Sequence, residues 1–260
     1  MRTYKVQVLD RAIAILDVLS RTGSEMALNE VTEAVGLHKS TIFRLLMVLE
    51  RERLVNRNPL TGRYRLGMKL FELGSKAVSN LSIRECARTQ LEHLAFETGE
   101  TVHLCVLDHG EMLYVDKVEP ERSVRLASSV GRRICMHCSA VGKVMLAFLP
   151  NDAVTDIIQQ HGMTRVTKNT ITTLENLNAE LAQIRERGYA IDNEENEEGV
   201  RCVAAPIRNY TGTVVAAVSI SGPTFRVKAE DIPALAAVLV KVADKISAEL
   251  GASLAKASGA

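Results

Sequence analysis

The sequence from Gly36 to Arg51 is GLHKSTIFRLLMVLER. Its apolar side chains recur at helical spacing (i, i+3, i+4 and i+7) and predict a helix with one buried stripe: Ile42, Leu45, Leu46 and Leu49. Because successive helical residues are turned by about 100°, the opposite side carries small polar and basic groups, with Ser40 and Arg44 among them. This stretch therefore predicts an amphipathic helix whose exposed side can contact a partner.

A second, shorter helix precedes it. Asn29 is expected to cap a helix that runs to Val35, and Gly36 suits the position after that helix, where φ is often positive. Two helices joined by a tight turn predict a helix-turn-helix, whose second helix enters the DNA major groove. The DNA-contacting residues expected on it are Lys39, Ser40, Thr41 and Arg44. The residues alone leave an ordinary amphipathic helix as the alternative.

A hairpin is expected directly after this helix. Leu54–Arg57 and Arg63–Leu66 have strand character, and Asn58, Pro59 and Gly62 form the turn between them. A hairpin in this position is typical of the wing of a winged helix-turn-helix. Arg57, Arg63 and Arg65 would then lie near DNA phosphates.

Composition and charge agree with a nucleic-acid module joined to a second module. The chain has 260 residues, 47% of them hydrophobic, with no Trp. Residues 1–70 carry a net charge of +5 and the remainder −4. The sequence contains neither a long apolar run nor a signal peptide, so no membrane association is expected. Five scattered cysteines do not suggest a disulfide framework, and they indicate a reducing, cytoplasmic location.

The rest of the chain predicts an α+β fold. A helix through Leu9 and Leu19 opens the chain, and a linker helix is expected after the wing. Beyond it, antiparallel hairpins alternate with helices, unlike the regular βαβ order of a dinucleotide-binding fold. We expect a DNA-binding domain at 1–66, a linker helix at 67–80 and a second domain at 81–260. Within the second domain, the expected helices and strands are 83–98, 101–107, 112–118, 124–127, 139–149, 151–160, 174–187, 189–192, 200–207, 213–221 and 232–250.

One stretch of the second domain suits an anion. Ser139-Ala140-Val141-Gly142-Lys143 is expected where a loop enters a helix, and small residues leave the first N–H groups of that helix accessible. These N–H groups can bind a carboxylate. Close packing of a helix on a sheet requires small residues too, and the residues alone do not choose between the two interpretations.

The chain resembles the isocitrate lyase regulator (IclR) family of bacterial transcription factors over nearly its whole length. The matching stretches are VLDRAIAILDVLS, EVTEAVGLHKSTIFRLLMVLERERLV, TGRYRLGMKLFELG, SSVGRRICMHCSAVGKVMLA, RERGYAIDNEENEEGVRCVAAPI and AAVSISGP. The resemblance implies a winged helix-turn-helix domain, a linker helix and an effector domain with a GAF-like or profilin-like antiparallel sheet. It also implies homodimers or homotetramers on palindromic double-stranded DNA operators. Within the family, DNEENEEG looks like the 2-keto-3-deoxygluconate regulators.

The resemblance also implies an effector site for a small carboxylate. The family's positions correspond to Ala140, Val141 and Gly142 at the helix start, and to Asp192, Cys202, Ser219 and Ser221 on later strands. Leu126 and Ile134 would form the apolar wall. The chain departs from the family at His38, where a proline or a small residue is common.

Two further groups of chemically reactive residues have a simple structural interpretation. Cys135-Met136-His137-Cys138 has no second ligand pair for structural zinc, and we expect two half-buried thiols in a pocket loop and no metal or other cofactor. The carboxylates around Asp192 are expected to be a solvated face. An enzyme would need a nucleophile and a base, and Cys202 with His137 is the pair to consider. A sensory protein without DNA binding would not need the excess of positive charge in residues 1–70. We therefore expect a ligand-controlled, DNA-binding regulator that is not an enzyme and that represses rather than activates.

Overall fold

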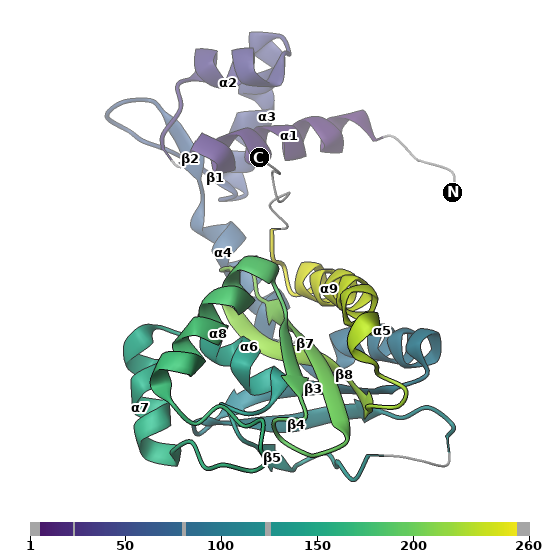
Figure 1. Cartoon of the computed structure of the whole chain (residues 1–260). Helices are drawn as coiled ribbons and strands as arrows, with labels where there is room; N and C mark the ends of the chain where they lie inside the picture. Colours follow the sequence, from purple (N-terminus) through teal and green to yellow (C-terminus); the bar gives the residue numbers. More distant parts are fainter. Residues whose placement is uncertain (1–5, 23, 80–81, 123–125, 254–260) are drawn as a thin grey trace. The chain divides into compact units, whose positions relative to one another are not determined.

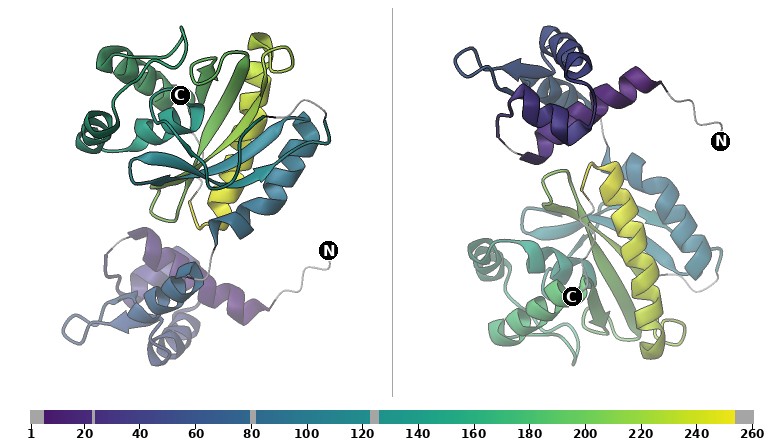
Figure 2. Two further views of the ribbon diagram at one scale, coloured as in Figure 1. Left: turned by 90° about the horizontal axis from the view of Figure 1, so that it is seen from below. Right: turned by 90° about the horizontal axis from the view of Figure 1, so that it is seen from above.

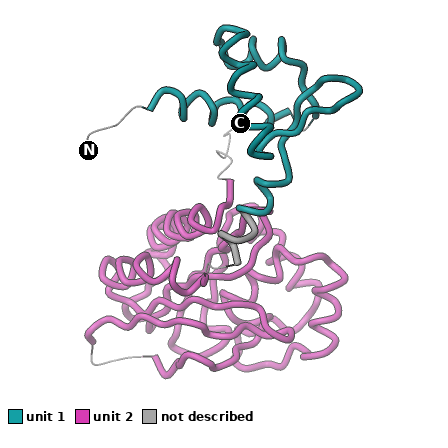
Figure 3. Tube along the Cα trace, turned by 180° about the vertical axis from the view of Figure 1, so that it is seen from behind, with its two compact units in different colours: residues 1–80 teal, residues 81–260 magenta. Residues whose placement is uncertain are grey.

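The computed structural model describes residues 6–22, 24–79, 82–122 and 126–253. It divides into two compact units, Met1–Asn80 and Leu81–Ala260 (Figure 3), and each has its own hydrophobic core. Within the described ranges, no helix is both long and apolar enough to cross a membrane. The strand expected at 124–127 lies partly outside the described residues, and its described part, Leu126 and Ala127, has no regular structure.

The first unit contains the expected helices and hairpin. Its elements are α1 (Gln7–Thr22), α2 (Leu28–Val35), α3 (Lys39–Arg51), β1 (Val55–Arg57), β2 (Tyr64–Leu66) and α4 (Met68–Ser79) (Figure 1). Ile42, Leu46 and Leu49 are buried against α1 and α2 residues such as Ile15 and Val31. The apolar stripe of α3 is therefore confirmed as the face that joins the helices of this unit.

The start of α2 differs from the expectation. The helix begins at Leu28, so Asn29 lies inside it and Ala27 takes the capping position. The carboxylate of Glu30 accepts a hydrogen bond from the Ala27 N–H at 2.6 Å, which is half of a capping box. Gly36 ends the helix with φ +73°, as expected for a left-handed position that disfavours a side chain.

The wing has one pairing that the sequence did not reveal. β1 and β2 are antiparallel, with Val55 opposite Leu66 and Arg57 opposite Tyr64. On the other side of Tyr64, Met26 exchanges two backbone hydrogen bonds with it, at 2.7 and 2.8 Å. The segment before α2 thereby fixes the hairpin to the helix-turn-helix.

The second unit is built on an antiparallel sheet. The elements are α5 (Ile83–Thr98), β3 (Thr101–Asp108), β4 (Glu111–Val118), β5 (Arg133–Ile134), α6 (Ala140–Phe148), α7 (Asn151–His161), α8 (Leu174–Arg187), β6 (Ala190–Asn193), β7 (Val200–Arg208), β8 (Val214–Pro223), a 3-10 turn η1 (Ala229–Asp231) and α9 (Ile232–Glu249). Among the described residues, six strands pair in the order β5-β4-β3-β8-β7-β6. This confirms the antiparallel α+β expectation, and it adds the short β5.

Helices cover both faces of this sheet. α5 and α9 pack on one face, and α6, α7 and α8 pack on the other (Figures 1 and 2). Alternation along β7 explains the two cores, because Val203 and Ala205 face α5 and α9 while Ala204 faces the side of α6. Cys202, Ser219 and Ser221, which were expected to bind the effector, lie on the α6 side of the sheet.

Candidate nucleic-acid interface and effector cavity

The exposed side of α3 carries the predicted DNA-contacting residues. Lys39, Ser40 and Arg44 are exposed, and Thr41 is half-buried at the first turn. Phe43 lies exposed beside them and was not foreseen. The first turn of α3 therefore presents hydroxyl and cationic groups, the groups that contact base edges and phosphates.

The wing arginines are not equivalent. Arg57 and Arg65 are exposed. The Arg63 guanidinium instead donates to both carboxylate oxygens of Glu30, at 2.7 and 3.0 Å, and to the Glu25 carbonyl at 3.1 Å. Arg63 therefore ties the wing to α2, and only its remaining hydrogen-bonding capacity is available to DNA.

Strand register brings the effector residues together. Asp192 of β6 is opposite Cys202 of β7, which is opposite Ser221 of β8. In the neighbouring row, Ser219 of β8 is opposite His103 of β3. Since residues two apart on a strand share a face, both rows point to the α6 side.

These rows form the floor of a cavity of about 210 Å³. The predicted residues that line it are Leu126, Ile134, Ala140, Val141, Asp192, Cys202, Ser219 and Ser221. Ser139 and Cys135, from the two stretches singled out in the sequence, also line it. Further lining residues that the sequence did not indicate include His103, Tyr114, Ser128, Arg132, Asn196 and Glu197. The cavity combines an apolar wall with hydroxyl, carboxyl, imidazole and guanidinium groups, as in sites for small polar ligands.

The N-terminus of α6 closes one side of this cavity. Ser139 caps the helix, accepting from the Gly142 N–H at 3.1 Å and donating to the Cys135 carbonyl at 2.6 Å. Gly142 is not among the described residues that line the cavity, and its N–H bonds to Ser139 instead of being open to a ligand. A Cβ at Gly142 would collide with the Met136 carbonyl oxygen, so this glycine permits close packing. The N–H groups of Ala140 and Val141 remain as donors for an anion.

His103 connects the floor to the wall formed by the segment that holds Leu126 and Ser128. Its Nε2 lies 2.7 Å from the Ser128 hydroxyl and its Nδ1 lies 3.4 Å from the Ser221 hydroxyl. Burial, with nearby Lys117, lowers the pKa of His103 to about 3, so the ring is neutral. A neutral ring both donates and accepts, which fixes the two hydroxyls. Lys117 donates to the Leu126 and Ser128 carbonyls and holds this wall in place.

Asp192 is a buried carboxyl at the other end of the floor. One of its oxygens accepts from the backbone N–H groups of Glu195, at 2.7 Å, and Asn196, at 3.3 Å. Burial outweighs these hydrogen bonds and raises the pKa of Asp192 to about 7. Burial also raises the pKa of the Cys202 thiol, the opposite of what a nucleophile requires.

The acidic loop is only partly the solvated face that was expected. Glu195 is buried, and its carboxylate accepts from the Lys143 ammonium of α6 at 2.5 Å. Lys143 is only 1% exposed. This ion pair joins the first turns of α6 to the loop after β6, and hence to the Asp192 end of the cavity.

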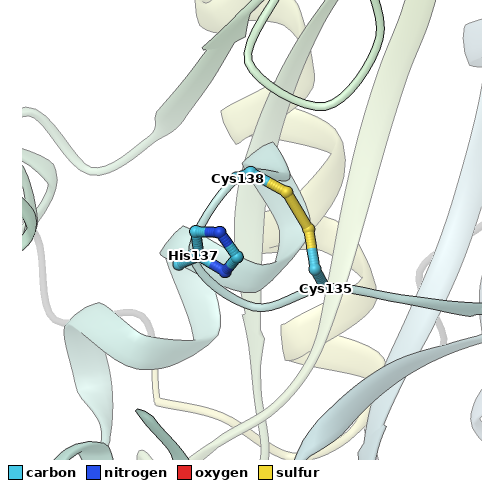
Figure 4. A group of neighbouring side chains, drawn as sticks. All are labelled: Cys135, His137 and Cys138. Carbon is cyan, nitrogen blue, oxygen red and sulfur yellow. A yellow bond between two sulfur atoms is a disulfide. The ribbon is translucent and has the colours of Figure 1, made fainter. Parts of the chain in front are cut away.

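The expectation of two thiols in Cys135-Met136-His137-Cys138 is wrong, because Cys135 and Cys138 form a disulfide (Figure 4). Cys135, His137 and Cys138 bring ligand atoms within 4.8 Å of one another, but sulfurs in a disulfide are not thiolate ligands. His137 bonds to the Thr164 carbonyl at 3.1 Å and lines a neighbouring cavity, whereas Cys202 lines the effector cavity. The structure therefore does not bring together the nucleophile and base considered for an enzyme.

Comparisons with known proteins cover both units. A family model for the C-terminal domain of the bacterial transcriptional regulator IclR matches residues 75–248, and one for the IclR helix-turn-helix domain matches residues 8–59. The regulator XynR of Escherichia coli K12 is 40% identical over 222 residues, covering 85% of this chain and 88% of the relative. KdgR of the same organism is 37% identical over 241 residues, 92% of each. The crystal structure of the Agobacterium tumefaciens repressor BlcR is similar with a TM-score of 0.83 at 28% identity, covering 96% of this chain and 100% of that one.

Proposed function

The chain belongs to the IclR family of bacterial transcriptional regulators, and on this premise we propose that it represses a carbon-catabolic operon until a small organic acid binds its C-terminal domain. As a member of this family it is a ligand-responsive, DNA-binding regulator. The names of its relatives support repression, since IclR, AllR and YiaJ are each called repressors. We propose no catalytic activity and no cofactor.

DNA binding is assigned to residues 1–66, with 67–80 as a linker helix. In this proposal Lys39, Ser40, Thr41 and Arg44 meet the major groove, and Arg57 and Arg65 of the wing meet phosphates. Arg63 contributes mainly by holding the wing against Glu30. The operator is a palindrome bound by a homodimer or homotetramer in the cytoplasm.

Effector binding is assigned to residues 81–260. The observation that carries it is a single cavity lined both by Ala140 and Val141, at the start of α6, and by Ser219, Ser221 and Asp192. The helix start attracts a carboxylate, and the hydroxyls and the carboxyl pair with hydroxyl or keto groups. Arg132 at the rim adds a positive charge. This lining favours a sugar acid over an aromatic acid.

Two measurements test this function. Gel shifts on the DNA upstream of the protein's own gene should show specific binding that a scrambled fragment lacks. Thermal shifts with 2-keto-3-deoxygluconate, pyruvate and benzoate should rank the sugar acid first. A ligand at about 100 times its Kd stabilises the native state by about 2.7 kcal/mol. Unchanged affinity for the sugar acid in Ser219→Ala/Ser221→Ala would refute the effector site without affecting the assignment of DNA binding.

A further inference from the structure

We propose that Cys135 and Cys138 form a reversible thiol–disulfide switch in the wall of the effector cavity, so that the redox state of this pair sets effector affinity. The switch rests on the proposed function only for its consequence, the change in affinity. The chemistry of the pair and its effect on the cavity wall do not depend on that function.

The pair lies in the local structure of a redox motif. Strand β5 ends at Ile134, the two cysteines and the residues between them follow, and α6 begins at Ala140. This order of strand, CxxC and helix is also found in thioredoxin-like redox proteins, and here it occurs on an antiparallel sheet. A helix start stabilises a thiolate, which is the form that attacks a disulfide.

The two sulfurs differ in access. Cys135 is half-buried and lines the cavity, whereas Cys138 is fully buried. A small molecule that enters the cavity therefore meets Cys135 first. Cys138, three residues further, lies within bonding distance of Cys135, as their disulfide shows.

Contacts connect the pair to both ends of the effector site. The Sγ atoms of Cys135 and Cys138 each lie 3.7 Å from Oδ1 of Asn196. In the dithiol each S–H can donate to this oxygen, whereas a disulfide has no proton to donate. The backbone N–H of Asn196 bonds to Asp192, and the Cys135 carbonyl accepts from Ser139, the cap of α6. A change at the sulfurs thus reaches the carboxyl and the helix start that we assign to the effector.

The co-reactant is a low-molecular-weight disulfide of the glutathione class. The Cys135 thiolate attacks one of its sulfurs, so that an S–S bond to Cys135 forms and the first small thiolate leaves. The Cys138 thiolate then attacks the Cys135 sulfur and expels the second thiolate. In sum, the protein dithiol is oxidised to a disulfide, the reagent is reduced to two thiols, and the two protein protons end on those thiols. A dithiol reductant reverses both steps.

In a reducing compartment, such a pair is expected to regulate the protein rather than to stabilise its fold. Disulfides of cytosolic proteins are usually transient and redox-sensing, because small thiols keep structural ones reduced. A pair that changes state there connects the regulator to oxidative conditions. Effector binding must in turn shift the redox equilibrium by the same factor as oxidation shifts effector binding.

The first test follows the sulfurs in the full-length protein. Samples equilibrated with different ratios of oxidised to reduced glutathione, with a chelator present, are alkylated and analysed by mass spectrometry. Cys135 and Cys138 should lose alkylation together as the ratio rises, and Cys135→Ser should abolish the transition. Cys86→Ser is the matched control, since Cys86 is also half-buried, and it should leave the transition unchanged. Persistent alkylation of both cysteines at every ratio would overturn the switch.

The second test measures coupling in two ways. Without ligand, hydrogen exchange at residues 139–143 and 192–197 should differ between oxidised and reduced protein, and the difference should vanish in Cys135→Ser and in Cys138→Ala. Equal exchange in both redox states of the wild type would refute the coupling, whatever the effector is. With 2-keto-3-deoxygluconate, Kd should differ by about fivefold or more between the two states. If exchange responds and this acid binds neither state, the switch stands and the effector assignment fails.

Discussion

Asp192 shows how burial controls the charge of a single side chain. Its carboxyl is 2% exposed and accepts two backbone hydrogen bonds, yet burial raises its pKa to about 7. A neutral carboxyl in the cavity does not repel a bound carboxylate, and it can donate to a ligand hydroxyl. The cavity is therefore better suited to an anion near pH 6 than near pH 8.

The raised pKa gives a pH-dependent stability with a definite sign. Unfolded Asp192 titrates near 3.8 and folded Asp192 near 7. Between these values the native state holds a proton that the unfolded state has released, so the free energy of unfolding falls as pH rises. Asp192→Asn cannot lose this proton. The stability of the variant relative to wild type should rise by at most about 1.4 kcal/mol per pH unit across this window and level off above it.

Chemical denaturation at several pH values, followed by circular dichroism, checks this. The low pKa of His103 acts in the opposite direction, because protonation of the unfolded state lowers stability below about pH 6.5. Glu195, Lys143, Glu197 and Arg132 also contribute charge near Asp192. These groups are present in both the wild type and Asp192→Asn, so their effects largely cancel in the difference between the two free energies of unfolding. A difference that does not depend on pH would contradict the raised pKa.

Arg44 is the second residue whose role can be isolated. It is exposed on α3, opposite the buried stripe, so its replacement should leave the fold intact. We expect Arg44→Ala to weaken operator binding by about 1–3 kcal/mol, and to affect scrambled DNA less. Arg65→Ala should weaken both more evenly, because a wing arginine meets phosphate. Gel shifts on both DNAs distinguish the two, and wild-type operator affinity in Arg44→Ala would refute the recognition-helix assignment.

Individual residues differ in how well their place in the fold can be predicted from the sequence. Periodicity identified the buried Ile42 and Leu46, and motif resemblance supplied Ser219 and Cys202, whose proximity depends on strand register. His103 was missed because a lone histidine inside an apolar strand has no local signal. The Cys135–Cys138 disulfide was missed because its formation depends on the turn between β5 and α6.

At the scale of elements, long periodic segments were predicted better than short or polar ones. The helices Ile83–Thr98 and Leu174–Arg187 have the expected bounds, since an apolar stripe and a terminal glycine define each. β5 has two residues and carries no periodicity that could reveal it. The loop after β6 was expected to be solvated because its acidic residues follow one another closely in the sequence. The cation that pairs with Glu195 is Lys143, 52 residues away, so nothing near Glu195 in the sequence indicates the pair.

The ion pair between α6 and this loop gives a prediction at the same scale. Lys143→Met leaves the Glu195 carboxylate buried without its cation, and breaking a buried pair costs about 3–5 kcal/mol. Lys241→Met makes the same change at an exposed position of α9 and should change stability little. The urea midpoint of the C-terminal unit in the full chain measures both. Replacing Glu195 with Gln in the Lys143→Met background should restore part of the loss, and equal midpoints for the two single variants would contradict the pair.

At the scale of the whole molecule, one chain offers a single recognition helix. The few base contacts of one such helix give limited specificity, and regulators of this kind double it by pairing half-sites about one helical turn apart. α1 and α4 also expose apolar side chains, including Leu9 and Ile13 on α1 and Met68 and Phe71 on α4, the last 68% exposed. On each helix these groups lie about one turn apart, and adjacent exposed apolar groups indicate a surface that associates.

We therefore expect a symmetric dimer or a larger assembly through these helices. Light scattering of the full-length protein at micromolar concentration should give at least twice the chain mass of 28.5 kDa. Phe71→Asp places a charge on the exposed face and should lower both the mass and the affinity for a two-half-site operator, with little change in affinity for a single half-site. Lys69→Asp alters charge on the same helix at a partly exposed position and separates a general charge effect from a loss of apolar contact. A protein of 28.5 kDa that remains monomeric on its operator would refute the assembly.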